Sequence, residues 1–225
     1  MCSIFGTSNK KLLKHLGIAG MVRGKDATGV ALNNDLKVVK GALKADEFLW
    51  DDLDNADFYM GHTRAKTQGS ENFNYNNHPF YGENNKYVLA HNGIISNDRI
   101  LSLDFDLPNT EIMTDSYIIV QLIDFFKKKS FKSEIDIEII KEAIEYITGS
   151  FALSIMTKNK LFLLRKTNPL NIIYNKKELI YASTKNMLNK ALKKIGKNEY
   201  DYGIAVEIQE EVIYEYNLQK KSFIQ

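Results

Sequence analysis

The sequence has a single cysteine, Cys2, so it cannot form an internal disulfide. A chain of this kind suits a reducing compartment, and we expect it in the cytoplasm. No apolar run approaches the roughly 18 residues that a membrane-spanning helix needs. The N-terminus also lacks the charged head and the apolar body of a secretory signal peptide. These absences predict a protein that does not associate with a membrane.

An excess of charge of either sign is also missing, because the formal net charge is only +2. The sequence has no continuous basic stripe of the kind that nucleic-acid-binding proteins use. Two lysine-rich segments, FKKKSFK and KALKKIGK, are better explained as solvated helix ends than as phosphate contacts. We therefore expect no nucleic-acid partner.

The composition that is present, 44% hydrophobic and 26% charged in 225 residues, suits one large globular domain or two small ones. Strand-like and helix-like patterns follow one another in mixed order, without a repeat, a low-complexity linker or a clear boundary. This order predicts one layered α+β domain over residues 1–225. The expected elements are a strand over 3–6, a helix capped by Ser8 or Asn9 that runs toward Gly24, a hairpin over 28–43, a strand over 57–65, a long loop over 66–85, a strand over 86–95, helices over 114–129 and 136–147, strands within 149–166 and 171–183 with Asn-Lys turns, a helix over 184–196 and a closing hairpin over 202–218.

Cys2 lies one residue from the start of the chain, where chemistry that needs a chain terminus is possible. Aminopeptidases remove an initiator methionine when the second residue is small, and that removal would give Cys2 a free α-amine. The pKa of such an amine is about 7.7–8.0, so it can accept a proton from the thiol at neutral pH. Taken alone, Cys2 is better explained as a small buried apolar residue.

Three other segments contain polar residues with more than one explanation. Arg64 follows a predicted strand, where it can bind a carboxylate or pair with a neighbouring acid. Asn92 and Gly93 lie at a predicted strand-to-loop junction, where they can form an oxyanion hole or an ordinary Asn-Gly turn. Asp115 begins a predicted helix, where it can cap the helix or bind an ammonium group.

Taken together and in this order, the segments resemble the glutaminase domain of class II glutamine amidotransferases, which are N-terminal nucleophile hydrolases. The family patterns MCGI.G, RG.DS.G, GHTR..T.G, HNG.I, TDSE and G.YAL are similar to MCSIFG, RGKDATG, GHTRAKTQG, HNGII, TDSY and GSFAL in this sequence. The matches span nearly the whole chain. The resemblance implies a four-layer αββα sandwich, in which two antiparallel sheets pack between helices.

The resemblance also implies roles for individual residues. Cys2, after removal of Met1, would attack the side-chain amide of glutamine, and Asn92 and Gly93 would stabilise the oxyanion. The substrate-binding residues would be Arg64 for the α-carboxylate, with Thr67 nearby, and Asp115 for the α-ammonium; Arg23 and Asp26 would support the site. The products would be glutamate and ammonia, and no cofactor is implied.

The sequence departs from the family pattern at three positions. Ser3 replaces a glycine beside the nucleophile, and Tyr117 replaces the acidic residue of TDSE. Ala65 replaces an aromatic residue of the loop that closes over glutamine, so closure would be weaker or would depend on Tyr75 or Phe80. If Met1 is retained, the proposed catalytic amine does not exist.

Three histidines, His62, His78 and His91, fall within these segments, but the family they resemble uses no metal, and we expect no metal site. No segment resembles a domain that consumes ammonia, so we expect a separate synthase subunit as partner. Two alternatives stay open, which are an amidohydrolase for another γ-glutamyl or amide substrate and a catalytically silent glutamine-binding or regulatory module.

Overall fold

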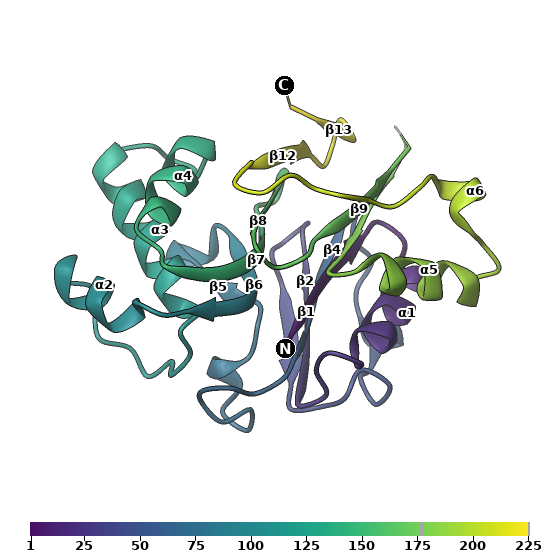
Figure 1. Cartoon of the computed structure of the whole chain (residues 1–225), viewed down its shortest axis with the longest axis horizontal. Coiled ribbons are helices and arrows are strands. Elements are labelled where there is room, and N and C mark those ends of the chain that lie inside the picture. The colour runs from purple at the N-terminus through teal and green to yellow at the C-terminus, as the bar shows by residue number, and fades with distance from the viewer. Residues whose placement is uncertain (176–177, 225) are drawn as a thin grey trace.

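The computed structural model of the protein describes residues 1–175 and 178–224. Two antiparallel sheets pack face to face, and helices cover the outer face of each sheet (Figure 1). The expected αββα sandwich is therefore present. Among the described residues, no helix combines the length and the apolarity that crossing a membrane requires.

The first sheet has seven strands in the order β11-β9-β10-β1-β4-β2-β3. β1 lies in its interior and pairs with β4 on one side and β10 on the other, with Ser3 opposite Thr63. This register places the start of β1 beside the end of β4. The bounds are β1 (Ser3–Thr7), β2 (Ala27–Leu32), β3 (Val38–Gly41), β4 (Tyr59–Arg64), β9 (Asn171–Tyr174), β10 (Leu179–Ala182) and β11 (Val206–Glu207).

The second sheet has six strands in the order β13-β12-β8-β7-β6-β5. Its longest strands, β6 and β7, pair along their whole length, with Asn92 opposite Ala152. The bounds are β5 (Phe80–Tyr81), β6 (Val88–Ile95), β7 (Gly149–Met156), β8 (Lys160–Lys166), β12 (Tyr214–Asn217) and β13 (Ser222–Phe223).

Helices form the two outer layers. α1 (Lys10–Gly20) and α5 (Lys185–Lys194) cover the first sheet, while α3 (Tyr117–Ser130) and α4 (Ile137–Glu145) cover the second. The short helices are α2 (Asp98–Asp104) and α6 (Glu199–Tyr202). Side-chain caps begin three of these helices, because Asn9, Asp136 and Thr184 accept hydrogen bonds from backbone N–H groups of the first turn.

Three apolar layers hold the sandwich together. In β1 the side chain of Ile4 packs between the sheets, and the next side chain, Phe5, packs under α1 and α5. In β4 the side chain of Met60 packs between the sheets, and that of Tyr59 packs on the side of α1 and α5. Successive side chains point to opposite faces of a strand, and here both faces are buried. This explains why these strands read as nearly continuous apolar runs.

Several sequence predictions about individual elements were wrong. Residues 202–218 do not form a hairpin, since β11 pairs with β9 in the first sheet and β12 pairs with β8 in the second. Each of these short strands covers a sheet edge that would otherwise be open. α1 ends at Gly20 and not near Gly24, and the predicted loop over 66–85 contains β5. The helix α2 was not predicted, and the turn expected near residue 176 lies outside the described residues.

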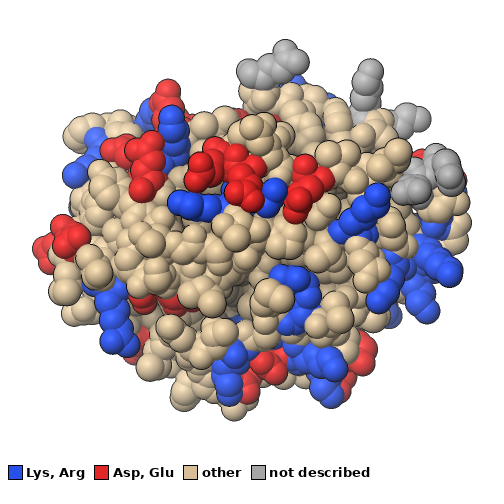
Figure 2. Space-filling view, viewed as in Figure 1, with Lys and Arg blue, Asp and Glu red and all other residues tan. Residues whose placement is uncertain are grey.

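Charges of the two signs are partly separated on the surface. On the face shown in Figure 2, acidic side chains form a band across the upper part, and basic side chains are more frequent on the right and in the lower part. Acidic and basic groups at the surface also pair, as Arg165 does with Glu210 at 2.9 Å. The small net charge of +2 therefore does not mean an even distribution of charge.

Three buried histidines lie close together, and the ring of His91 points toward the start of α3. The rings of His62 and His78 are 4.2 Å apart, and His62 Nε2 lies 3.1 Å from the backbone oxygen of His91. Burial lowers the pKa of His62 and of His91 to about 3, and it also lowers the pKa of His78 well below its ordinary value. The folded protein therefore holds neutral imidazoles that the unfolded chain would protonate below about pH 6.5.

We predict that acid destabilises the fold in the window from pH 6.5 downward. At pH 5 one such buried histidine lowers the free energy of unfolding by about 2 kcal/mol relative to pH 7, because the unfolded state binds a proton that the folded state does not. Urea unfolding at pH 7 and pH 5 measures the effect. A His78→Gln variant should show a smaller pH dependence than a His15→Gln variant, and identical midpoints at both pH values would contradict the prediction.

Candidate active site

Cys2 lies directly before β1, where the antiparallel register brings it to the end of β4. Its Sγ is 3.4 Å from the backbone nitrogen of Ala65, which donates to it, and 3.6 Å from the Ala65 oxygen. The backbone oxygen of Cys2 accepts a hydrogen bond from Arg23 Nε at 2.8 Å. The thiol is half-buried, and Met1 before it is 75% exposed. Met1 is therefore accessible to solvent, whereas hydrogen bonds to Arg23 and Ala65 hold Cys2 in place.

The electrostatic surroundings of the thiol favour its protonated form. Burial raises the pKa of Cys2, and the carboxylate of Asp115 raises it further. The Ala65 N–H, the N-terminal charge and the Arg64 guanidinium act in the opposite direction on the same pKa. A base that accepts the thiol proton is therefore needed before this sulfur can act as a nucleophile.

Ser3, one of the departures from the family pattern, does not point toward the thiol. Its hydroxyl lies 2.6 Å from that of Thr63, and both are buried under α1 near Gly20. Strand alternation places the side chains of Cys2 and Ile4 on the opposite face, toward the second sheet. The side chain of Ser3 is therefore accommodated in the helical layer.

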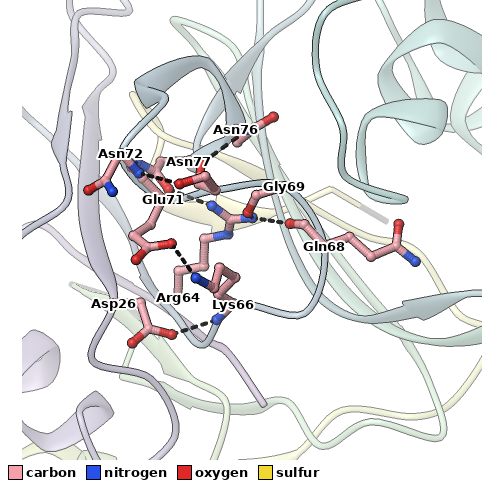
Figure 3. A network of polar contacts seen from close by, with 10 residues as sticks. Asp26, Arg64, Lys66, Gln68, Gly69, Glu71, Asn72, Asn76 and Asn77 are labelled. Atoms are coloured by element: carbon pink, nitrogen blue, oxygen red, sulfur yellow. Dashed lines mark hydrogen bonds and ion pairs between the residues drawn. The ribbon is translucent and has the colours of Figure 1, made fainter.

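Arg64 ends β4 and is only 3% exposed. Its Nη1 donates to Asn77 Oδ1 at 2.8 Å, and its Nη2 contacts the backbone oxygens of Gln68 and Gly69, the latter at 2.9 Å (Figure 3). No described carboxylate forms an ion pair with it, so the pairing with a neighbouring acid is not found. Burial lowers the pKa of Arg64, and the charges of Cys2, Glu71, Asp26 and Asp115 oppose that shift. A buried cation without an acid partner is suited to an anionic ligand.

Asn92 and Gly93 lie inside β6, paired with Ala152 and Phe151 of β7, and not at a strand-to-loop junction or in a turn as predicted. The Asn92 side chain is 1% exposed, and neither atom of its amide bonds to any described residue. Its backbone oxygen accepts from Asn168 Nδ2 at 2.7 Å. A Cβ at Gly93 would lie 1.9 Å from the Ser150 oxygen, so the backbone here requires glycine.

Asp115 does not cap α3, which contradicts the capping explanation. Its Oδ2 accepts from the backbone nitrogen of Ile95 at 2.7 Å, at the end of β6, and its Oδ1 lies 3.4 Å from Ser116 Oγ. Ser116 Oγ is in turn 2.7 Å from His91 Nδ1. Burial raises the pKa of Asp115, and its backbone hydrogen bonds oppose the shift. The carboxylate is thus fixed to the second sheet.

These contacts gather the candidate residues at one end of both sheets. The charges of Arg64 and Asp115 lie close enough to Cys2 to shift the pKa of its thiol, and Cys2 and Asp115 act in the same way on the pKa of Arg64. His62 Nε2 contacts the backbone oxygen of His91, so β4 and β6 lie close together at this point. Arg64 comes two positions after His62, and Asn92 directly follows His91. Arg64 and Asn92 therefore lie at the same level of the sandwich. The arrangement therefore brings together a thiol, a cation and a carboxylate, and it leaves the unbonded amide of Asn92 on β6 at the same level of the sandwich.

The other predicted site residues lie at different distances from this group. Arg23 supports the Cys2 backbone, as described above. Asp26 Oδ2 accepts from the backbone nitrogen of Lys66 at 2.7 Å, and the Asp26 nitrogen donates to the Arg64 oxygen at 2.9 Å (Figure 3). Thr67 is exposed, and no polar contact joins it to a described residue, so its role stays a prediction.

Sequence reasoning missed Asn77 and Asn168, which hold Arg64 and Asn92 respectively. Asn77 lies in a polar loop with many asparagines, and nothing in the sequence distinguishes it from its neighbours. Within the described part of the chain, no three His, Cys, Asp or Glu side chains are arranged to hold a metal ion. The histidines pack instead as a cluster in the core.

Comparisons with known proteins agree with this architecture. The family model of the glutamine amidotransferase domain matches residues 62–190. The chain is 29% identical over 183 residues to glutamine–fructose-6-phosphate aminotransferase (isomerizing) of Staphylococcus epidermidis, which covers 76% of this chain and 30% of that protein. The chain thus spans about 30% of the length of the curated relatives that it matches.

Two solved structures share the fold. The glutamine phosphoribosylpyrophosphate amidotransferase of B. subtilis superimposes with a TM-score of 0.73 at 19% identity, over 96% of this chain and 47% of that one. A glutamine aminotransferase class-II domain protein from Silicibacter pomeroyi gives 0.58 at 10% identity, over 99% and 98% of the two chains. With the family match over more than half of its length, the chain belongs to the class II glutamine amidotransferases, whose fold is that of the N-terminal nucleophile hydrolases.

Proposed function

We propose that the protein hydrolyses the side-chain amide of glutamine to glutamate and ammonia, with Cys2 as the nucleophile. The observation that supports this most strongly is Arg64, a buried cation that lacks an ion-pair partner among the described residues and lies near the thiol. Such a cation supplies the binding energy for a carboxylate, and it does so beside the reactive sulfur.

Glutamine carries one carboxylate, one ammonium and one amide, and the site offers one group for each. Arg64 binds the α-carboxylate, with Thr67 nearby. Asp115 binds the α-ammonium, and that charge favours the ionised form of a carboxyl whose pKa burial raises. Asn92 and Gly93 receive the amide oxygen, a function that suits the unbonded side-chain amide of Asn92.

The reaction begins after Met1 is removed, since that step frees the α-amine of Cys2. The amine accepts the thiol proton, and the sulfur attacks the amide carbon, so that a C–S bond forms and the carbonyl oxygen becomes an oxyanion. The Asn92 amide and the Gly93 N–H donate to this oxygen. The C–N bond then breaks, the proton on the amine passes to the departing nitrogen, and ammonia leaves a γ-glutamyl thioester. Water attacks the thioester, and the thiol recovers its proton as glutamate is released.

The ammonia is used by a separate synthase subunit in this proposal. Ammonia is mostly ammonium at neutral pH and is then a poor nucleophile, so release into solution would waste glutamine. An amidohydrolase for other γ-glutamyl amides remains the alternative, favoured by Ala65, whose small side chain leaves room beside the thiol that an aromatic residue would fill. Ammonia release from glutamine, compared with turnover of γ-glutamyl peptides, separates the two.

Cys2→Ala should abolish ammonia release from glutamine, because no other thiol is present. The thermal unfolding midpoint should stay close to that of the unmodified protein, as the side chain is half-buried and small. Intact mass should show loss of Met1 and a single covalent adduct with a glutamine-like diazoketone, absent from Cys2→Ala. Unchanged turnover in the variant, or a retained Met1 in an active enzyme, would refute the role of Cys2.

Arg64→Ala should raise the KM for glutamine about 10- to 150-fold, since a hydrogen bond to a charged group contributes about 1.5–3 kcal/mol. The kcat should change less than the KM. Steady-state kinetics measure both, and Arg99→Ala, which removes an exposed arginine of α2, is the matched control. An unaltered KM in a folded Arg64→Ala protein means that Arg64 has only a structural role.

Asn92→Ala should lower kcat about 100- to 1,000-fold, the effect of removing one oxyanion donor, while KM changes little. The donor acts on charge that develops only in the transition state, so substrate binding is largely spared. Asn168→Ala serves as a comparison, because it removes a contact with the backbone of Asn92 and leaves the amide in place. A kcat for Asn92→Ala equal to that of the unmodified protein excludes this assignment.

A further inference from the structure

The segment 74–80 crosses the first sheet beside Arg64, and we name it the clamp segment. It lies close over β2, where a Cβ on Gly29 would be only 2.0 Å from the backbone oxygen of His78. It is also fixed to β3, since Lys40 Nζ donates to the backbone oxygens of Asn77 at 2.6 Å and Pro79 at 2.9 Å. Asn74 Nδ2 completes the attachment by donating to the Lys40 oxygen at 2.9 Å.

Asn77 connects the clamp segment to the active site. Its Oδ1 accepts from Arg64 Nη1 at 2.8 Å, and its Nδ2 donates to the Glu71 oxygen at 2.7 Å (Figure 3). Because a guanidinium has donors only, the amide oxygen must face Arg64, and this fixes the orientation of the Asn77 side chain. Asn77 is 1% exposed, so neither contact is open to solvent.

We infer that Lys40 and Asn77 are positioning residues for Arg64, with Lys40 holding the backbone of Asn77 and Asn77 holding the guanidinium. The inference rests on the proposed function, because it says that these two residues raise the affinity of Arg64 for the carboxylate of glutamine. Neither residue touches substrate in this account. Their contribution is to fix the guanidinium before the carboxylate arrives, which reduces the side-chain entropy lost on binding.

Charge around Lys40 supports the same conclusion. Arg64, His62 and His78 face its ammonium group, the two imidazoles are neutral, and no described carboxylate pairs with it. Its ammonium group also contacts the two backbone oxygens and the ring of Phe80, whose centroid is 5.3 Å away. Burial lowers the pKa of Lys40 to about 8, and Arg64 contributes to the shift. Protonated Lys40 therefore adds positive potential near the carboxylate position at pH 7.

The first test measures glutamine kinetics in Asn77→Ala and Lys40→Met. Both should raise KM about tenfold and leave kcat within about threefold, because the reacting atoms are untouched. Lys37→Met and Asn72→Ala, which remove exposed side chains from the same two regions of the chain, should leave both constants unchanged. Unaltered KM values in folded Asn77→Ala and Lys40→Met overturn the inference.

A double-mutant cycle separates positioning from general stabilisation. In an Arg64→Ala background, Asn77→Ala should cause no further rise in KM, because the group that Asn77 positions is absent. Equal increases in both backgrounds would mean that Asn77 acts independently of Arg64. Should Asn77→Ala fail to fold, Asn77→Ser and Lys40→Gln provide smaller perturbations of the same contacts.

The pH dependence offers a signature that loss of packing would not give. Between pH 7 and pH 8.5 the KM of the unmodified protein should rise about threefold as Lys40 loses its proton, since stabilisation by this cation is present below its pKa and lost above it. Lys40→Arg should show a KM near the unmodified value at pH 7 and a flatter profile, because arginine stays charged. Identical profiles for the two proteins contradict the role of the Lys40 charge.

A final measurement does not depend on glutaminase activity. Phenylglyoxal modifies accessible arginines, and mass spectrometry can follow Arg64 alone. The modification should be severalfold faster in Asn77→Ala and Lys40→Met than in Lys37→Met. Absence of ammonia release by the unmodified protein would refute the proposed function, whereas an unchanged modification rate would refute the positioning of Arg64 whatever the enzyme's activity.

Discussion

The antiparallel pairing of β1 with β4 is the interaction on which the site depends. It sets Ser3 opposite Thr63, so the residue before β1 and the residues that end β4 meet at one edge of the sheet. The thiol of Cys2 consequently contacts the backbone of Ala65, next to Arg64. A shift of one residue in this register would turn every side chain of β1 to the other face and remove the thiol from the space between the sheets.

The site contains buried polar and charged groups without the partners that such groups normally have in a folded protein. The Asn92 amide lacks a partner among the described residues, and Arg64 lacks an acid there. An unsatisfied buried polar group costs about 1–3 kcal/mol, which is similar to the gain from burying one large apolar side chain. The three apolar layers of the sandwich offset such costs. Binding of a ligand that satisfies these groups would recover part of the free energy.

Loop groups hold the guanidinium of Arg64, although the residue itself ends β4. The Arg64 side chain is bonded to Gln68, Gly69 and Asn77 of the segment that follows β4, and Lys40 attaches this segment to β3, on the far side of β2. Asn92 lies within β6, and Cys2 directly precedes β1. The sheets therefore anchor all three residues, and the loop adds contacts that fix the Arg64 guanidinium before a ligand binds.

The sequence by itself determined local elements and singled out the candidate residues, because periodicity and short motifs are local properties. β1, a cap at Ser8 or Asn9, the β2–β3 hairpin and the segments around Cys2, Arg64, Asn92 and Asp115 could all be read from it. Tertiary structure alone decided what depends on partners distant in the chain. It placed Asn92 within β6, tied Asp115 to Ile95 in place of a cap, and assigned β11 and β12 to different sheets. It also determined that Asn77, and not another of the loop asparagines, accepts the hydrogen bond from Arg64 Nη1. Strand partners and side-chain contacts across 13 or more positions are selected by packing of the whole chain, and no local pattern encodes them.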